Sequence, residues 1–156
     1  MLLKKLKGQS FETEVPRPNY DQVAPAPKIN DISKAKIALV TDGGLVPEGN
    51  PDQIEIKTAT RFGKYSFKGM DSLRAADYEV KHAGYDSVFV RQDPNRLVPV
   101  DVMRQLEKEG VIGGLHEKFY STTGVANIVE TMDKMGQAIA GELKQRGVDG
   151  VILTST

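Results

Sequence analysis

The chain has 156 residues, no cysteine, and 21 basic against 21 acidic side chains, so its formal net charge is zero. This length is most simply one domain, and the charge balance gives no global field that would favour nucleic acid or an anionic membrane. The lack of cysteine excludes a disulfide framework and a thiolate metal site, and we predict no bound metal.

The first residues are not expected to form a secretory signal, because the apolar start runs at once into Lys4 and Lys5. No apolar run in the sequence approaches the ~20 residues that are needed to span a bilayer. We therefore expect a cytoplasmic protein.

Residues 1–33 are predicted to form an extended, non-helical arm. Pro16, Pro18, Pro25 and Pro27 lie in polar surroundings, and proline fixes φ and removes a backbone donor. The segment is either a loose tail or an arm that lies across a neighbouring subunit. Its candidate anchors are the large apolar residues Leu2, Leu3, Leu6 and Phe11.

The first clear strand is predicted at residues 36–42, where a continuous apolar run suits burial on both faces. It ends in Thr41, Asp42, Gly43 and Gly44, which would place a carboxylate and flexible backbone at the carboxyl edge of the sheet, where ligands bind. The glycines do not match the dinucleotide fingerprint G-x-G-x-x-G, so no NAD binding is predicted. The turn either approaches a ligand or is a tight structural turn.

The middle of the chain is less regular. Residues 45–52 are predicted to be a loop, and residues 53–76 are either two short strands or an irregular excursion. Alternation at residues 78–82 indicates a strand. His82, at the end of this strand, is either a general acid whose tautomer is fixed by Asp86 or a structural histidine.

A turn then leads into a helix that is predicted to begin at Pro99 and to end at Gly110. Before it, Arg96 is either a bidentate partner for a substrate carboxylate or half of a surface ion pair with Asp93 or Asp101. The apolar face of the helix is predicted to contain Val98, Val102, Met103 and Leu106.

The strongest helical periodicity covers residues 125–146, after a possible strand at residues 115–120. The hydroxyl-rich turn between them is expected to cap the helix, and it also offers N–H groups to an anion such as an amino acid carboxylate. A last apolar run at residues 148–156 is typical of a buried parallel strand. The turn consists of Ser121, Thr122, Thr123 and Gly124, and the last strand ends in Thr154, Ser155 and Thr156.

This order of elements predicts an α/β fold over residues 34–156, specifically a Rossmann-like or flavodoxin-like three-layer sandwich with a mainly parallel sheet. Strands 36–42 and 148–156 are both apolar enough to be central, and their carboxyl ends would point the same way. The helix would return the hydroxyl-rich turn to the same edge. The three polar turns, at residues 41–44, 121–124 and 154–156, are therefore expected to form one site.

Several stretches carry a resemblance to a known family. They are ALVTDGGLVP at 38–47, GNPD at 49–52, HAGYD at 82–86, QDPNRLVP at 92–99, YSTTG at 120–124 and VDGVILTST at 148–156. Together they resemble the selenoprotein subunit of component B of glycine, sarcosine and betaine reductases. The resemblance covers residues 11–156, and the selenoprotein subunit of D-proline reductase is a more distant match.

The resemblance implies that, in the family, a selenocysteine follows the position of Thr156 and opens a helix whose amino terminus favours the selenolate. This chain would then stop before the selenocysteine and the carboxyl-terminal helices, and would itself be inactive. Selenium in the family serves reductive cleavage of the C–N bond of glycine, sarcosine or betaine. The partners implied are a second selenoprotein, which receives the carboxymethyl group, and a pyruvoyl-type subunit.

The resemblance also suggests roles. Asp42 and His82 are candidates for proton transfer, and Thr156 flanks the reactive position. We further expect a homo-oligomer, because the arm and the uncovered sheet expose apolar surface. The alternative function is a non-enzymatic subunit that holds a small carboxylate or serves assembly. The candidate substrate-binding residues are Thr41, Gly43, Gly44, Arg96, Ser121, Thr122, Thr123, Gly124, Thr154 and Ser155.

Overall fold

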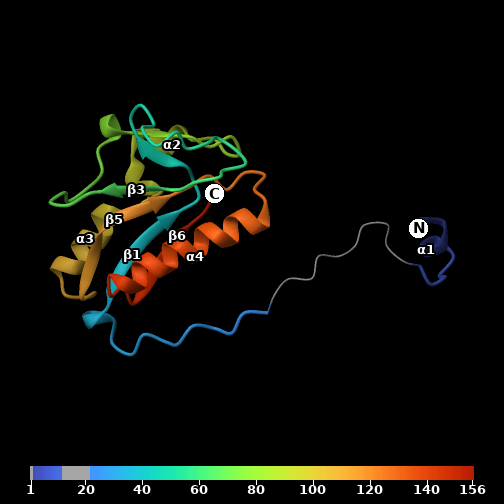
Figure 1. Ribbon diagram of the computed structural model, residues 1–156, viewed down its shortest axis with the longest axis horizontal. Coiled ribbons are helices and arrows are strands. Elements are labelled where there is room, and N and C mark those ends of the chain that lie inside the picture. Colours follow the sequence, from blue (N-terminus) through green and yellow to red (C-terminus); the bar gives the residue numbers. More distant parts are fainter. Residues whose placement is uncertain (1, 12–21) are drawn as a thin grey trace.

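The structure, a computed structural model, describes residues 2–11 and 22–156. Its centre is a sheet made of β1 (Lys36–Thr41), β3 (Gly63–Ser66), β5 (Gly114–Ser121) and β6 (Gly150–Thr154) (Figure 1). The strand order is β3-β5-β1-β6. β1 runs parallel to both β5 and β6, whereas β3 is antiparallel to β5. The predicted α/β fold with a mainly parallel sheet is confirmed.

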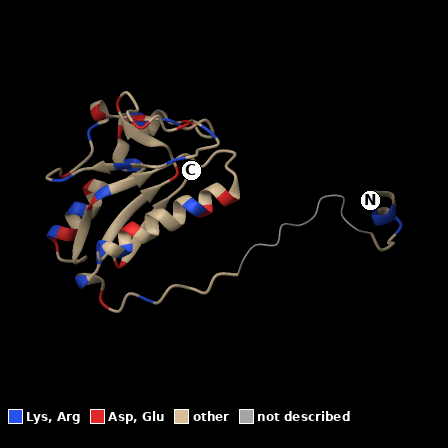
Figure 2. Ribbon diagram, viewed as in Figure 1, with Lys and Arg blue, Asp and Glu red and all other residues tan. Residues whose placement is uncertain are grey.

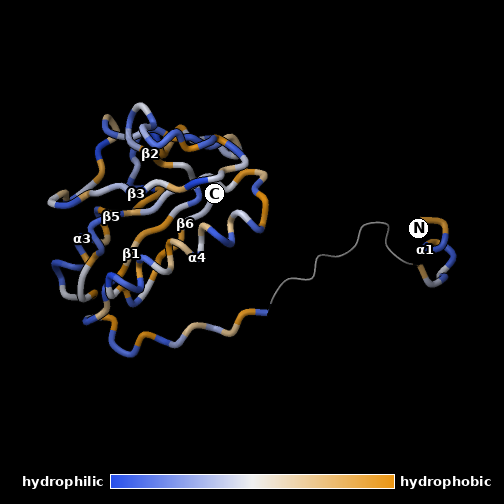
Figure 3. The backbone as a smooth tube through the Cα atoms, viewed as in Figure 1, coloured by the Kyte–Doolittle hydropathy of each residue, from blue (hydrophilic) through white to orange (hydrophobic). Residues whose placement is uncertain are grey.

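Helices cover both faces of this sheet. Successive residues of a strand point to opposite faces, so Ile37 and Leu39 pack on the side of α3 (Val100–Lys108), and Ala38 packs on the side of α4 (Val129–Gln145). The hydrophobic stretch of β1 is thus enclosed between two layers (Figure 3). The α3 side also contains Val100, Met103, Leu115 and Phe119, and the α4 side contains Tyr120, Ile139 and Leu143.

A second, two-stranded sheet lies beside the first. β2 (Leu45–Pro47) pairs antiparallel with β4 (Tyr78–Val80). The prediction of a loop at residues 45–52 is therefore wrong for residues 45–47. The strand predicted at residues 78–82 is confirmed for residues 78–80, which form β4. Residues 53–76 contain β3 and the start of η2, and the backbone between them is irregular. The short helices are α2 (Val88–Gln92), η1 (Ile32–Lys34), η2 (Ala75–Asp77) and η3 (Pro94–Arg96).

The amino-terminal segment departs from the extended arm at its start and at its end, where η1 begins at Ile32. Residues 2–6 form a short helix, α1 (Leu2–Leu6), because leucine and lysine favour helix and the prolines come later in the chain. Residues 22–30 contain no helix or strand, as expected of an arm. Pro16 and Pro18 lie outside the described residues. None of the helices in the described ranges is long and apolar enough to cross a membrane.

The predicted helix after Pro99 is present, with shifted boundaries and one misplaced side chain. Pro99 is the residue before the first turn of α3, and Gly110, with a φ of 71°, lies just beyond its end. Val102 is 52% exposed, so it does not belong to the apolar face. Val98 and Met103 are buried as expected.

β6 is an edge strand in this sheet, which corrects the expectation of a buried, central strand. Within the described residues it pairs with β1 alone. Its apolar side chains are uncovered: Val151 is 50% exposed and Leu153 is 64% exposed. An apolar run makes a strand suitable for burial, but neighbouring elements decide whether it is covered.

Candidate functional site

The three polar turns meet at the carboxyl edge of the parallel strands. The Thr41 hydroxyl donates to the Thr154 carbonyl oxygen over 3.1 Å, and the Asp42 N–H donates to the same oxygen over 3.2 Å. The Gly124 N–H donates to the Asp42 carbonyl oxygen over 2.8 Å. An isolated bridge joins residues 43 and 123. The ends of β1, β5 and β6 are thereby held as one unit, as the parallel arrangement predicts.

Asp42 supplies the carboxylate at this edge. The Ser155 hydroxyl donates to its Oδ2 over 2.9 Å, while its Oδ1 is buried and has no hydrogen-bond partner among the described residues. A Cβ at Gly124 would lie 2.9 Å from Oδ2, so a side chain there would collide with the carboxylate. Buried polar atoms are nearly always partnered. Asp42 Oδ1 is therefore the atom of this edge that most needs a ligand or water.

The glycine N–H groups at this edge are bonded within the fold, which favours the tight structural turn over the approach to a ligand. The Gly43 N–H donates to the Thr41 hydroxyl over 3.1 Å, and the Gly44 N–H donates to the Thr122 carbonyl oxygen over 2.9 Å. The Gly124 N–H is occupied by Asp42. These glycines build the turn rather than offer donors from it.

The hydroxyl-rich turn does not cap α4, which corrects another expectation. The helix begins at Val129, after a turn in which Ala126 has a φ of 51°, and no side chain caps its first residue. The Thr122 hydroxyl instead donates to the Arg61 carbonyl oxygen over 2.9 Å, and that of Thr123 donates to the Lys81 carbonyl oxygen over 2.7 Å. Both threonines therefore fasten neighbouring loops to the edge. The Ser121 hydroxyl is buried without a partner among the described residues.

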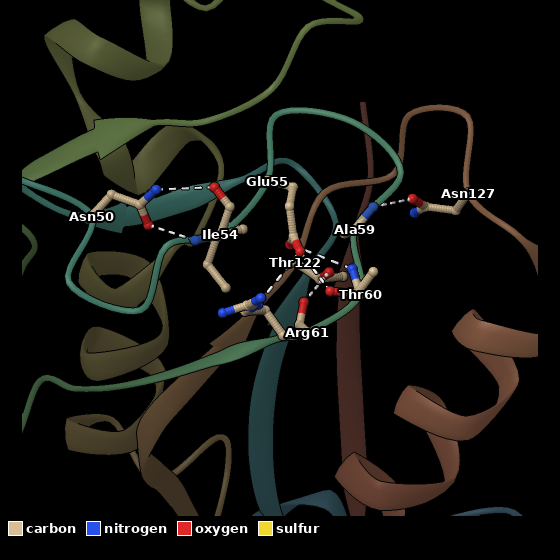
Figure 4. A network of polar contacts seen from close by, with 8 residues as sticks. All are labelled: Asn50, Ile54, Glu55, Ala59, Thr60, Arg61, Thr122 and Asn127. Carbon is tan, nitrogen blue, oxygen red and sulfur yellow. Dashed lines mark hydrogen bonds and ion pairs between the residues drawn. The ribbon is translucent and has the colours of Figure 1, made fainter.

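A loop between β2 and β3 is anchored to this edge by polar contacts (Figure 4). Asn127 accepts the Ala59 N–H over 2.7 Å, and its amide donates to the Thr123 carbonyl oxygen. Asn50 closes the start of the loop through two 2.9 Å bonds with the backbone of Ile54. Sequence reasoning did not single out either asparagine, although asparagine commonly bonds loop backbone in this way.

The carboxylate whose charge acts on His82 is that of Asp42 and not that of its expected partner Asp86. The Gly84 N–H donates to His82 Nδ1 over 3.1 Å, which places the proton of the neutral ring on Nε2. Burial lowers the pKa of His82, and the charge of Asp42 partly opposes this by raising it. Asp86 accepts the Val88 N–H over 3.1 Å instead. The role expected of Asp86, fixing the tautomer, is therefore taken by backbone.

Tyr85 completes this part of the site and was missed by sequence reasoning. Its ring centroid lies 4.9 Å from that of His82, and its hydroxyl donates to the Gly43 carbonyl oxygen over 3.0 Å. Burial raises the pKa of Tyr85, so the hydroxyl stays protonated and continues to donate. The stretch HAGYD at residues 82–86 could have indicated this pair, because His82 and Tyr85 lie only three positions apart in it.

We expect the Asp42→Asn substitution to lower the pKa of His82 further, because it removes the negative charge that favours the imidazolium. The pKa is measured by NMR titration of the His82 ring protons. The matched control is Asp86→Asn, which should leave the pKa of His82 unchanged. An equal shift in both variants, or none in Asp42→Asn, would contradict the pairing of His82 with Asp42.

Two predicted site residues stand apart from these contacts. Arg96 lies 3.9 Å from Asp93 and over the ring of Phe89, with 5.6 Å to the ring centroid. Thr156 is exposed at the end of the chain, beyond Ser155. In the described part of the chain, no group of three or more His, Cys, Asp or Glu residues is placed to hold a metal ion.

A cavity of about 290 Å³ opens beside the polar edge, between α4 and the sheet. Asp42 and Thr122 lie at its polar end. The other walls are mainly apolar, so the cavity offers apolar contacts beside one carboxylate. They include Val40, Met132, Met135, Ile139, Val151 and Leu153.

Comparison with known proteins places the chain in a family. The family model described as glycine/sarcosine/betaine reductase selenoprotein B (GRDB) matches residues 1–156. A glycine reductase complex component B subunit gamma of Carboxydothermus hydrogenoformans is 54% identical over 156 residues. Sarcosine and betaine reductase complex component B subunits beta of Peptoclostridium acidaminophilum are 52% and 50% identical.

These three matches cover 100% of this chain but 36% of each relative, so the chain spans about a third of their length. A D-proline reductase subunit gamma of Acetoanaerobium sticklandii is 32% identical over 159 residues, which is 99% of this chain and 60% of that relative. No solved structure matches the chain. The chain belongs to the glycine/sarcosine/betaine reductase selenoprotein B family.

Proposed function

We propose that this chain forms the substrate-binding edge of a component B in a reductase that cleaves the C–N bond of glycine, sarcosine or betaine. The observation that carries the proposal is that Asp42 lines a mainly apolar cavity and that its buried Oδ1 has no hydrogen-bond partner among the described residues. The relatives of this chain, which are named as component B subunits of glycine, sarcosine and betaine reductase complexes, support the same proposal.

The chemistry of the three amines fits such a cavity. Each carries a cationic nitrogen beside a carboxylate, and the nitrogen is attracted to the carboxylate of Asp42. The N-methyl groups of sarcosine and betaine suit the apolar walls that Met132 and Val151 help to form. His82 is the proposed proton donor in its imidazolium form, which the negative charge of Asp42 favours. The Ser155 hydroxyl, which donates to Asp42 Oδ2 in the structure, is the proposed contact for the substrate carboxylate once the substrate nitrogen takes its place at Asp42.

The reduction itself requires a group that the chain does not contain. It has no cysteine, and its sequence shows no selenocysteine, so we propose that the 156-residue chain alone is inactive. A selenol in the longer relatives would supply the redox chemistry. The other reductase components are its proposed partners. Self-association is also proposed, because the exposed apolar residues of β6 favour it.

We propose further that the sheet is of the doubly wound, Rossmann-like or flavodoxin-like type. β5 and β6 flank β1 on opposite sides, and α3 and α4 lie on opposite faces. In such sheets ligands bind where the strand order reverses, at the carboxyl ends. Asp42 follows β1 at that point.

Binding of the substrate tests the site directly. Betaine titrated into the labelled chain should shift the NMR signals of residues 41–44 and 122–124 in a saturable way. Asp42→Asn should weaken binding about tenfold, because it removes a partly buried charge partner. Asp86→Asn is the matched control and should bind normally. Equal binding by all three proteins would remove Asp42 from the site.

An activity assay tests the proposed inactivity of the chain. We expect no thiol-dependent release of amine by the 156-residue chain when the partner components are present. The readout is ammonia, methylamine or trimethylamine from the three substrates. Amine release above the level without the chain would contradict its proposed inactivity.

A further inference from the structure

A second, polar cavity of about 160 Å³ lies toward the amino ends of the strands. Lys36 begins β1 and Arg146 follows the last residue of α4, so this cavity is at the far end of β1 from Asp42. Six residues of strand separate Lys36 from Asp42, which is ~20 Å at 3.3 Å per residue. Charged residues gather where α4 ends beside the start of β1 (Figure 2). The lining consists of Lys36, His116, Glu117, Lys118, Glu142 and Arg146.

His116 is the buried polar group of this cavity. Its side chain is 7% exposed, and its Nε2 has no hydrogen-bond partner among the described residues. The ring lies nearly parallel to that of Tyr120, with 6.1 Å between centroids. Since buried polar atoms are usually satisfied, the unpartnered Nε2 of His116 points to a bound ligand or ordered water. The volume is well above the roughly 10–15 Å³ that one water needs.

The charges around the cavity leave an excess of cations. The carboxylate of Glu142 is engaged by Lys64 at 3.1 Å, and that of Glu117 lies 3.6 Å from Lys68. Within residues 2–11 and 22–156, Lys118 and Arg146 have no carboxylate within 4.0 Å.

Lys36 Nζ donates to the Arg146 carbonyl oxygen over 3.1 Å, which keeps the ammonium beside the cavity. Burial lowers the pKa of His116, and the charges of Lys36, Arg146 and Lys118 lower it further, whereas Glu142 opposes them. The neutral imidazole can therefore act as a donor from whichever nitrogen holds its proton.

We propose that this cavity binds a small oxyanion of the inorganic phosphate class, with His116 at its base and Lys36, Lys118 and Arg146 as its cationic partners. These donors come from β1, β5 and the end of α4, so they approach from different directions. Such an arrangement suits a tetrahedral anion better than a planar carboxylate. The guanidinium of Arg146 adds the forked geometry that matches phosphate oxygens.

Phosphate titrated into the 15N-labelled chain tests this site, with sodium chloride holding the ionic strength constant. We expect saturable shifts of the His116 ring nitrogens and a rise in the pKa of His116, because a bound anion favours the imidazolium. Acetate is the planar comparison and should bind more weakly. Equal affinity for acetate and phosphate would overturn the phosphate assignment.

Variants locate the binding. Arg146→Gln should weaken phosphate binding about tenfold, since it removes a charge-assisted hydrogen bond. Arg146 is exposed, so the fold should survive, and Lys118→Gln provides a second variant. Lys108→Gln, which removes a lysine that pairs with Asp71 at 2.8 Å on α3, is the matched control and should bind normally.

Asp42→Asn should also leave phosphate binding unchanged. The phosphate proposal and the substrate-binding proposal at Asp42 can therefore fail independently of each other. Shifts that do not saturate, or that are the same in Arg146→Gln and Lys108→Gln, would mean that the cavity holds only water.

Discussion

Phe119→Ala should lower the free energy of unfolding by about 3–5 kcal/mol, which is typical for removal of a buried phenylalanine. Phe119 is fully buried in the middle of β5. Its ring lies 5.4 Å from that of Tyr65, 6.4 Å from that of Phe67 and 5.9 Å from that of Tyr78. The substitution therefore leaves a cavity where the main sheet meets β4. This loss is a large part of the roughly 5–15 kcal/mol that stabilises a typical domain.

The matched control for this prediction is Phe89→Ala. Phe89 is 59% exposed and stacks on Arg96, so its removal should cost no more than about 1 kcal/mol. Urea unfolding followed by circular dichroism measures both variants. Similar losses in the two variants would show that the aromatic group around Phe119 is not the centre of the core.

Gly44→Ala should lower the free energy of unfolding by about 2–4 kcal/mol, the sum of a left-handed backbone penalty and a steric collision. Gly44 has a φ of 72°, and a Cβ there would lie 2.2 Å from the Lys81 carbonyl oxygen. The collision is with backbone, which cannot rotate away. Gly44 also joins two parts of the site. Its N–H donates to the Thr122 carbonyl oxygen, and its own carbonyl oxygen accepts the Lys81 N–H over 2.8 Å.

Gly49→Ala separates the two causes. Gly49 has a φ of 81°, but a Cβ at this position would meet no atom within 4 Å, so only the backbone penalty of about 1–2 kcal/mol applies. Thermal unfolding of both variants measures the difference. NMR signals of His82 should move in Gly44→Ala and stay in place in Gly49→Ala. A loss in Gly44→Ala no greater than in Gly49→Ala would contradict the close approach at Lys81.

Local patterns in the sequence determined the longer elements of the fold. The apolar run of β1 and the 3.6-residue periodicity of α4 each reflect a face that must be buried, and such periods depend on nearby residues alone. The carboxyl ends of parallel strands must meet, so the convergence of Asp42, Thr123 and Thr154 at one edge could also be predicted. The family resemblance rested on the same short stretches and was confirmed.

Long-range contacts decided the rest. Residues 45–47 became a strand because β4 lies beside them, and β6 stayed exposed because no described element covers it. The hydroxyls of Thr122 and Thr123 found carbonyl partners 61 and 42 residues away, so they hold loops instead of capping α4. His82 was singled out from sequence, but its neighbour Asp42 lies far along the chain. Such partners depend on how distant segments pack, which composition and periodicity do not encode.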